Sequence, residues 1–367
     1  MTEQNRAGAG VGLVLSGGGA KGAYQAGVLS ALTESNISVG CLAGASIGAL
    51  NGAIVSAASS QEDAVRRLQA LWEELAQVPP IRFGGRLLKV PAYVAALMSF
   101  GLPLRAGAGL AAALRATMMA RSVWDKVVDV IPALQVFEGD NDGLVCNKRI
   151  TSLIDEYLPE GGLPDRLPLH VSVFPTQGAF RDILSIVGSG LGLTDTADSE
   201  FMHVQALPVR EQKKVLFASA ALPLLFTPQR LDGKLYTDGG QGGWRSVQGN
   251  TPIQPLLDAG CSHVIVTHLA DGSAWERHRF PDASIIEIRP SGISRGNTFS
   301  DLLGFDAERI PDWIEQGYED TLACLGRIRE TLDAHTSLSA ARGALDASLA
   351  RTGEADLARA MKRLREG

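Results

Sequence analysis

The stretch Ser16–Gly27, SGGGAKGAYQAG, follows the apolar run 11–15, VGLVL, and opens a segment with apolar residues at helical spacing. This order predicts a β-strand, a glycine-rich loop and an α-helix. Glycines allow close backbone approach and positive φ angles, so the loop is a candidate functional site. Three kinds of loop have this composition: a dinucleotide-binding turn, the phosphate loop of a nucleotide hydrolase, and an oxyanion hole for ester chemistry.

The dinucleotide-binding alternative lacks its second requirement. Gly17, Gly19 and Gly22 fit the pattern G-x-G-x-x-G. That pattern also needs an acidic residue about 20 positions on, to bind the ribose hydroxyl. The next apolar run, 37–42, carries no acid, and Glu34 lies before it on the predicted helix. The sequence therefore argues against a dinucleotide site.

The phosphate-loop alternative fails at a single position. Its pattern places a lysine and a hydroxyl residue directly after the last glycine. Here Gly22 is followed by Ala23 and Tyr24. What remains is a loop whose backbone N–H groups, at the positive end of the following helix, stabilise an anion formed during a reaction.

A nucleophile for such a reaction is present in the segment 44–48, GASIG. It forms the pattern G-x-S-x-G between an apolar run and a predicted helix, which is the context of a nucleophile elbow. Its glycines, Gly44 and Gly48, permit the sharp turn that exposes the hydroxyl of Ser46. We expect the amide of Ile47 to join the glycine loop as an oxyanion donor.

The base that activates the serine has two candidates. Among six histidines, His268 is the best placed, because it ends the apolar run 262–268, whereas His263 begins the same run as an ordinary polar residue. The other candidate is Asp238 in the segment 236–240, YTDGG, at the end of a predicted strand. The residues alone leave a Ser-His-Asp triad and a Ser-Asp pair equally open.

The remaining pattern predicts an α/β fold with a mostly parallel sheet and helices on both faces. A small-residue helix is expected over 49–59 and an amphipathic helix over 61–77. Proline-interrupted segments over 79–121 predict a helical cap. Further strands are expected within 167–176, 214–228, 234–240, 262–270 and 284–290. Two helices in 306–367 are expected to pack on the outside of the sheet.

Composition narrows the class of protein. With 34 basic and 40 acidic residues, the net charge is −6, and no basic block is present that would bind a nucleic acid polymer. The four cysteines lie far apart and are expected to be buried free thiols. The start of the chain is polar and lacks a signal-peptide pattern, so a cytoplasmic location is expected. The apolar stretch 90–104 is shorter than the roughly 20 residues of a spanning helix.

Three motifs together, GGGAKG at 17–22, GASIG at 44–48 and DGG at 238–240, resemble those of the patatin-like phospholipase family. The segments 218–240 and 250–253 are similar to the family as well, and the resemblance runs from about Val11 to about Pro290. It implies a three-layer α/β/α fold, with a catalytic domain over 8–305 that includes the cap at about 79–121. The C-terminal helical extension is expected over 306–367.

The resemblance also implies the roles of the site residues. Ser46 becomes the nucleophile and Asp238 its base, which leaves His268 outside the chemistry. Oxyanion donors are expected at Gly17, Gly18, Gly19 and Ile47. The motif is completed by supporting residues, namely Lys21, Gly22, Gly44, Gly48, Gly239 and Gly240. No metal and no cofactor are expected.

The implied function is hydrolysis of fatty-acyl esters of glycerophospholipids at a membrane surface, with the protein peripheral to the inner membrane. Alternatives are a soluble carboxylesterase or thioesterase on the same pair of residues, and an inactive lipid-binding or scaffold protein. Activation by a ligand such as a cyclic nucleotide, as in antiphage effectors, and homo-oligomer formation stay open. The chain departs from the family by an insertion at 241–249, which carries Trp244 and Arg245.

Overall fold

The computed structural model describes residues 10–77, 152, 155–176, 182, 196–221, 228–243, 247–270, 272, 275–291, 305 and 307–366. The expected cap at 79–121, as well as Trp244 and Arg245, lies outside these ranges. The chain divides into a compact unit that ends at Asp320 and a second unit, Thr321–Gly367. The first unit contains the sheet and all the expected site residues.

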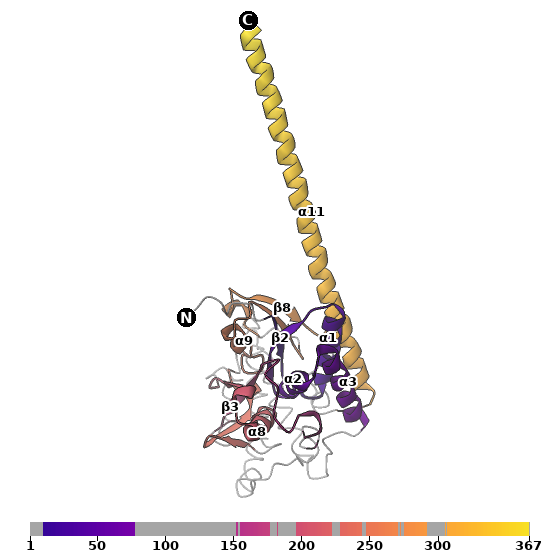
Figure 1. Cartoon of the computed structure of the whole chain (residues 1–367), viewed down its shortest axis with the longest axis vertical. Coiled ribbons are helices and arrows are strands. Elements are labelled where there is room, and N and C mark those ends of the chain that lie inside the picture. Colours follow the sequence, from indigo (N-terminus) through magenta and orange to yellow (C-terminus); the bar gives the residue numbers. More distant parts are fainter. Residues whose placement is uncertain are drawn as a thin grey trace, which may run out of the picture. The chain divides into compact units, whose positions relative to one another are not determined.

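The first unit contains both strands and helices, which alternate from β1 to α2 (Figure 1). The strands among the described residues are β1 (Val11–Leu15), β2 (Val39–Ala45), β3 (Leu169–Pro175), β4 (Glu200–His203), β5 (Gln229–Leu231), β6 (Lys234–Asp238), β7 (His263–Thr267) and β8 (Ser284–Ile288). The α-helices are α1 (Ala23–Glu34), α2 (Ile47–Ala57), α3 (Gln61–Gln77), α8 (Val209–Ser219), α9 (Gln254–Asp258) and α11 (Arg309–Glu366), and the 3-10 helices are η2 (Gly19–Gly22), η4 (Val204–Ala206), η5 (Gly239–Gln241) and η6 (Arg277–Arg279).

The strands form one sheet in the order β5-β6-β3-β2-β1-β7-β8, and β4 also pairs with β3. The five strands β1, β2, β3, β7 and β8 are parallel, whereas β4 and β6 run antiparallel to β3. On one side of β3, Ala45 of β2 pairs with Ser172, and on the other side Asp238 of β6 pairs with Val173. The last residues of β2 and β6 therefore flank the same short part of β3.

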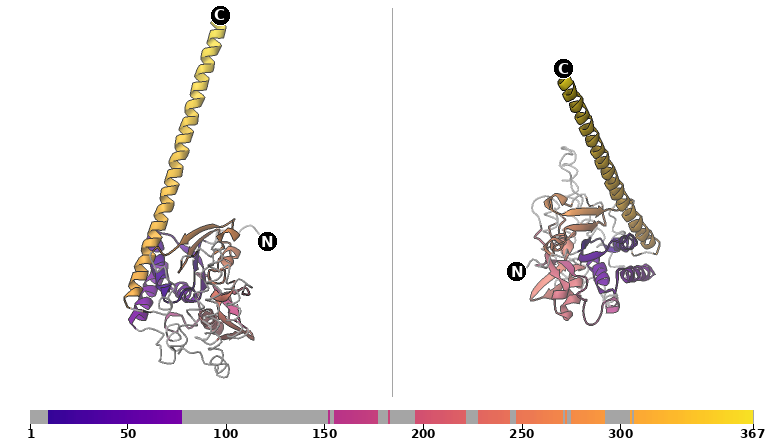
Figure 2. Two further views of the ribbon diagram at one scale, coloured as in Figure 1. Left: turned by 180° about the vertical axis from the view of Figure 1, so that it is seen from behind. Right: turned by 45° about the horizontal axis from the view of Figure 1, so that its top comes forward.

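Helices pack on both faces of the sheet, as the three-layer prediction requires. On one face, Gly52 of α2 leaves room for the side chains of Leu15 and Leu169, and α1, α2 and α3 lie together (Figure 2). On the other face, Val14 belongs to a buried cluster with Leu256 of α9. The consecutive residues Val14 and Leu15 of β1 thus face opposite helical layers, which confirms the predicted α/β/α fold.

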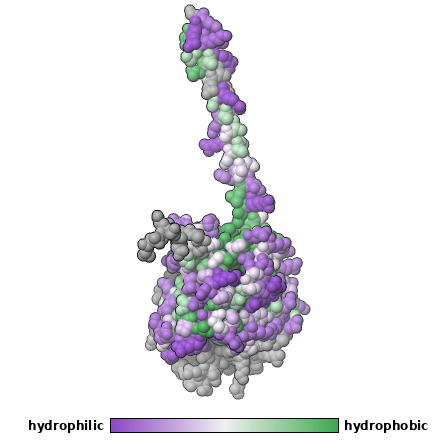
Figure 3. All heavy atoms as spheres, viewed as in Figure 1, coloured by the Kyte–Doolittle hydropathy of each residue, from purple (hydrophilic) through white to green (hydrophobic). Residues whose placement is uncertain are grey.

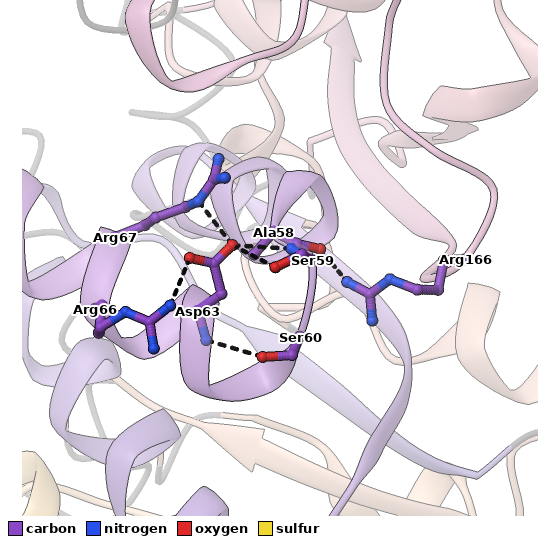
Figure 4. Close-up of polar contacts among 7 residues, drawn as sticks. All are labelled: Ala58, Ser59, Ser60, Asp63, Arg66, Arg67 and Arg166. Atoms are coloured by element: carbon purple, nitrogen blue, oxygen red, sulfur yellow. Dashed lines mark hydrogen bonds and ion pairs between the residues drawn. The ribbon is translucent and has the colours of Figure 1, made fainter.

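The start of α3 is fixed by a reciprocal cap (Figure 4). The hydroxyl of Ser60 accepts a hydrogen bond from the amide of Asp63 at 3.1 Å, and the carboxylate of Asp63 accepts one from the amide of Ser59 at 2.9 Å. The same carboxylate pairs with Arg66 and Arg67 one turn later. These contacts satisfy amides at the helix start, and the helix runs over the predicted residues 61–77.

One predicted strand is wrong over the part that the structure describes. The run 214–228 was expected to extend the sheet, but residues up to Ser219 belong to α8. Within α8, Gln212, Val215, Leu216, Ala218 and Ser219 are buried, which is the spacing of a helix face. The charged residues of α8 all lie before Val215, so the part of the helix from Val215 onward contains only apolar and small residues. Considered alone, that part had the composition of a strand.

The C-terminal residues form one continuous helix, α11, where two were expected. The segment 335–343 between the two expected helices contains no proline, and its residues Leu338, Ala340, Ala341 and Arg342 favour a helix, so the helix continues through it. Beyond Asp320, hydrophobic side chains are exposed among hydrophilic ones (Figure 3), namely Leu322, Leu332, Leu338, Leu345, Leu349, Leu357, Met361 and Leu364. None of the described helices is long and apolar enough to cross a membrane.

Three cysteines fall within the described residues. Cys41 and Cys261 are buried free thiols, as predicted, and Cys324 is half-buried. Gly12 leaves the space beside Cys261, because a Cβ at Gly12 would lie 3.3 Å from the Cβ of Cys261. The two buried thiols thus belong to the apolar layer that covers β1 and β2.

The first turns of α11 pack closely on α1. A Cβ at Gly317 would lie 2.0 Å from the carbonyl oxygen of Tyr24, and a Cβ at Gly27 would lie 1.8 Å from that of Ile314. The hydroxyl of Tyr24 donates to Asp320 Oδ2 at 3.0 Å. Backbone meets backbone at this crossing, so neither glycine tolerates a side chain.

Gly317→Ala should lower the free energy of unfolding by about 3 kcal/mol or more, because the new methyl group overlaps the backbone of α1. Gly326→Ala is the matched control on the same helix, since a Cβ there meets nothing within 4 Å. This control should instead stabilise the protein slightly, by about 0.5–1 kcal/mol. Urea unfolding of both variants measures the difference, and equal effects would contradict the close crossing.

Candidate active site

Ser46 lies on a strained turn between β2 and α2. Its φ of 53° and ψ of −125° are unusual for a residue with a side chain. A Cβ at Gly44 would lie 2.5 Å from the carbonyl oxygen of Gly48, and a Cβ at Gly48 would lie 2.0 Å from that of Leu15. Both glycines are therefore required by the tight turn, which has the geometry of a nucleophile elbow.

The amide of Ser46 is held by a buried serine from another element. It donates to Ser219 Oγ at 3.0 Å, and Ser219 Oγ donates to the carbonyl oxygen of Ser172 in β3 at 2.7 Å. Ser46 itself is half-buried and stands at the N-terminus of α2, where the first backbone amides lack partners within the helix. The residue is thus fixed by its backbone while its side chain borders the glycine loop.

The glycine loop lies directly beside Ser46. A Cβ at Gly17 would lie 3.0 Å from the Cβ of Ser46, and one at Gly18 would lie 2.7 Å from that of Leu269. Gly19 has a φ of 60°, which favours glycine. Lys21 lies in η2 and is buried. The loop therefore needs residues without side chains to approach the serine.

A buried polar network fixes both ends of this loop. Gln25 Nε2 donates to the carbonyl oxygen of Ser16 at 2.8 Å, and Asn51 Nδ2 donates to that of Gly22 at 2.9 Å. Asn51 also donates to Gln25 Oε1 and accepts from Trp72 Nε1 at 3.2 Å. Because these partners are buried and mutually bonded, the loop is held in place before any ligand binds.

Asp238 ends β6 and caps η5. Its Oδ1 accepts a hydrogen bond from the amide of Gly240 at 2.8 Å, and its own amide donates to the carbonyl oxygen of Ala221 at 3.0 Å. Gly239 has no room for a side chain, since a Cβ would lie 2.1 Å from the carbonyl oxygen of Ser172. Asp238 Oδ2 is buried without a hydrogen bond within the described part of the chain.

The structure brings Asp238 and Ser46 together across β3. Burial raises the pKa of Asp238 from 3.8 to about 6, whereas the neighbouring side chain of Ser46 and the amide of Gly240 lower it. Removal from water disfavours the charged carboxylate, so burial is the dominant cause. A carboxyl group with this pKa exchanges protons near neutral pH.

Asn250 connects the serine side of the site with the aspartate side. Its carbonyl oxygen accepts from the amide of Gly17, and its Nδ2 donates to the carbonyl oxygen of Gly17, both at 3.3 Å. Its Oδ1 lies 2.4 Å from the position of a Cβ at Gly17 and 2.8 Å from one at Gly240. Asn250 therefore packs between the two glycine segments.

The insertion at 241–249 closes on itself at its described ends. The amide of Gly249 donates to the carbonyl oxygen of Gly242 at 3.0 Å, and that of Gly243 to Ala197 at 3.0 Å. The chain therefore leaves the site after Gly240 and returns to it at Asn250.

His268 is engaged by residues other than the serine. It is buried directly after β7, and its Nε2 lies 2.9 Å from Glu287 Oε2. Its ring packs edge-on against Trp275 at 5.7 Å between centroids, and a Cβ at Gly272 would contact the ring. His263 is exposed at the start of β7. Among the described residues, no group of three or more His, Cys, Asp or Glu could hold a metal ion.

Sequence reasoning missed the polar residues that hold the site. Ser219, Gln25, Asn51 and Thr251 carry no recognisable motif, and Thr251 Oγ1 lies 3.0 Å from Ser16 Oγ. Their single signal is the presence of polar side chains within otherwise apolar segments predicted to be buried. Such residues need internal partners, and here the partners are backbone and side-chain atoms in and around the site.

Comparison with known proteins gives the class of the chain. Residues 13–257, more than half of the chain, match the family described as patatin-like phospholipase. The matched residues include the glycine loop, Ser46 and Asp238. The chain therefore belongs to the patatin-like phospholipase family, as its motifs predicted.

Individual relatives are similar over smaller parts or at low identity. A segment of 44 residues, 12% of this chain, is 57% identical to lysophospholipase nte1 of Aspergillus terreus and spans 3% of that protein. The crystal structure of VipD from Legionella pneumophila is 16% identical with a TM-score of 0.42, over 87% of this chain and 67% of that one. The type III effector protein ExoU is 14% identical with a TM-score of 0.33, over 87% and 53%.

Asp238→Asn should stabilise the folded protein at alkaline pH. Because the native carboxyl has a raised pKa, the native state binds a proton more tightly than the unfolded chain, and stability falls as the pH rises from 3.8 to about 6. Asparagine carries no charge and avoids this cost. We expect a gain of up to about 3 kcal/mol at pH 8 that shrinks toward zero at pH 4.

Urea unfolding of Asp238→Asn and of the native sequence at both pH values measures the gain. Asp165→Asn is the control, since that carboxylate is exposed and hydrated and should give no comparable difference. A destabilised Asp238→Asn variant at pH 8 would show that burial of the charge is not the dominant effect at this position.

Proposed function

We propose that the chain hydrolyses fatty-acyl esters of glycerophospholipids through an acyl-enzyme on Ser46, with Asp238 as the base. The observation that carries this proposal is the meeting of the two side chains across β3, beside a glycine loop at the start of a helix. Membership of the patatin-like phospholipase family supports the reaction class. Family resemblance supports the choice of these two residues.

In the first step, Ser46 Oγ attacks the carbonyl carbon of the ester while its proton passes to a carboxylate oxygen of Asp238. The carbonyl oxygen becomes an oxyanion. When the bond from carbon to the leaving oxygen breaks, Asp238 returns the proton to that oxygen, and the lysophospholipid departs. Water then attacks the acyl-enzyme, loses a proton to Asp238, and releases the fatty acid, with the proton passing back to Ser46.

The environment of Asp238 suits this role. Its pKa of about 6 keeps it deprotonated at neutral pH and close enough to that pH to accept and return a proton. Oδ1 is fixed by the amide of Gly240, while Oδ2 makes no hydrogen bond among the described residues and is the oxygen that we assign to proton transfer. The serine therefore needs no imidazole in this mechanism.

The oxyanion donors in the proposed site are the amides of Gly18, Gly19 and Ile47. We expected Gly17 to contribute as well, but its amide donates to the carbonyl oxygen of Asn250. Gly17 instead allows the loop to approach Ser46 closely. Preorganised amides of this kind stabilise the charge that develops on the carbonyl oxygen.

Glycerophospholipids at a membrane surface are the proposed substrates, and short soluble esters or thioesters are the alternative. The experiment compares release of fatty acid from phospholipid vesicles with hydrolysis of short-chain nitrophenyl esters, with and without added cyclic nucleotides. We expect the vesicles to be the better substrate. Preference for short esters would favour a soluble esterase, and no labelling of Ser46 by a fluorophosphonate under any condition would favour a protein without enzymatic activity.

Ser46→Ala should lower kcat/KM by about 10,000-fold or more, because the acyl-enzyme cannot form. Asp238→Asn should have nearly the same effect. His268→Ala is the control, since His268 is bonded to Glu287, and it should keep most of the activity. Loss of activity in a folded His268→Ala variant would favour a triad over the proposed pair.

The activity should fall at acidic pH because the base must be deprotonated. With a pKa of about 6 for Asp238, kcat/KM should drop about tenfold for each pH unit below 6. His268→Ala should show the same acidic limb. A limb that shifts or disappears in His268→Ala would assign the titrating base to the histidine.

A further inference from the structure

We propose that the last residue of α8 and the two residues after it, Ser219–Ala221, form a clamp that sets the spacing between Ser46 and Asp238, and that Ser219 is a positioning residue for the nucleophile. We call this segment the α8 clamp. The inference rests on the proposed roles of Ser46 and Asp238. It concerns how their backbones are held, not which residues react.

The clamp bonds to the backbone of Ser46, which lies just beyond the last paired residue of β2. The ladder between β2 and β3 ends at the pair Ala45 and Ser172, so the amide of Ser46 has no strand partner. It donates instead to Ser219 Oγ at 3.0 Å. Because Ser46 has a positive φ, this hydrogen bond helps to hold a backbone conformation that residues with side chains disfavour.

The hydroxyl of Ser219 has a defined direction. It is fully buried and donates its proton to the carbonyl oxygen of Ser172 at 2.7 Å. With its proton committed to Ser172, the oxygen presents a lone pair to the amide of Ser46. One side chain thus ties the elbow to the central strand β3.

The last residue of the clamp, Ala221, holds the backbone of Asp238. The carbonyl oxygen of Ala221 accepts from the amide of Asp238 at 3.0 Å and from the hydroxyl of the preceding residue, Thr237. Ser219 and Ala221 are two residues apart. A single short turn therefore bonds to the backbone amides of both proposed catalytic residues.

These contacts lie next to the strand that separates the two residues. Ser172, which accepts from Ser219, lies beside Val173, which pairs with Asp238. Gly239 accepts from Ser199 Oγ at 2.6 Å, which fixes the residue after the aspartate independently of α8. Loss of the Ser219 hydroxyl should therefore release Ser46 while leaving Asp238 in place.

The test compares Ser219→Ala with Ser56→Ala, a matched control on α2. Ser56 is also fully buried, donates to a backbone carbonyl oxygen, that of Leu167, at 2.6 Å, and accepts an N–H, from Gln205, at 2.9 Å. Both variants lose a buried hydroxyl with the same hydrogen-bonding pattern. Only Ser219 contacts the elbow.

Ser219→Ala should lower kcat about 10- to 100-fold, since small displacements of a reacting group cost rates of this order, with KM nearly unchanged. The rate of Ser46 labelling by a fluorophosphonate should fall in parallel. Ser56→Ala should keep kcat and the labelling rate. The two variants should lose similar amounts of thermal stability, which separates positioning from a general effect on folding.

Hydrogen exchange supplies a measurement that does not depend on activity. Mass spectrometry of peptides spanning 44–50 should show faster amide exchange in Ser219→Ala than in Ser56→Ala. Ser219→Cys is the second variant, for use if the alanine variant does not fold. Its thiol is a weaker acceptor of similar size, so the same changes should appear with smaller amplitude.

Unchanged kcat and unchanged exchange in a folded Ser219→Ala or Ser219→Cys variant would overturn the α8 clamp. An equal fall of kcat in Ser56→Ala would overturn it as well, because the effect would then be general. Failure of the proposed function has a different signature, in which Ser46→Ala retains the activity of the native sequence. In that case the exchange result still decides whether Ser219 holds the elbow.

Discussion

The register of β3 is the constraint on which the site depends. This strand pairs with the end of β2 on one side and with the end of β6 on the other, at the neighbouring residues Ser172 and Val173. Neighbouring strands lie about 4.8 Å apart, so the two flanking chain ends can face each other across a single strand. A shift of either pairing by one residue would turn Ser46 or Asp238 toward the opposite face of the sheet.

The site carries a cost in stability that the surrounding structure offsets. Ser46 has a positive φ, and Asp238 is a buried carboxyl whose Oδ2 lacks a hydrogen bond within the described residues. Both features oppose folding. The network of Gln25, Asn51 and Trp72 offsets this cost, because it fixes the glycine loop through buried hydrogen bonds. The two proposed catalytic residues thus carry these costs, while the residues that hold the glycine loop are well bonded.

Much of the fold and the motifs could be predicted from the sequence, because a glycine in a motif often marks a position where the fold leaves no room for a side chain. Gly44, Gly48 and Gly239 stand where a Cβ would meet backbone, and each belongs to a motif that the sequence displays. By contrast, the antiparallel approach of β6 to β3 depends on contacts between residues far apart in the chain. The position of Ser219 depends on where α8 packs, and its segment had the composition of a strand when considered alone. The engagement of the Gly17 amide by Asn250 likewise needed the tertiary structure.

The positions of Ser46 and Asp238 in the chain also set the order in which the parts of the site are synthesised. Asp238 is synthesised 192 residues after Ser46 (238 − 46), and β3 and α8 are both made between them. At about 5–20 residues per second, the ribosome needs about 10–40 s to cover that distance. During this interval the nascent chain carries the elbow and the glycine loop without the carboxylate. A chain released before β6 is made contains the serine but not the carboxylate, so the proposed active site is complete only after β6 has been synthesised.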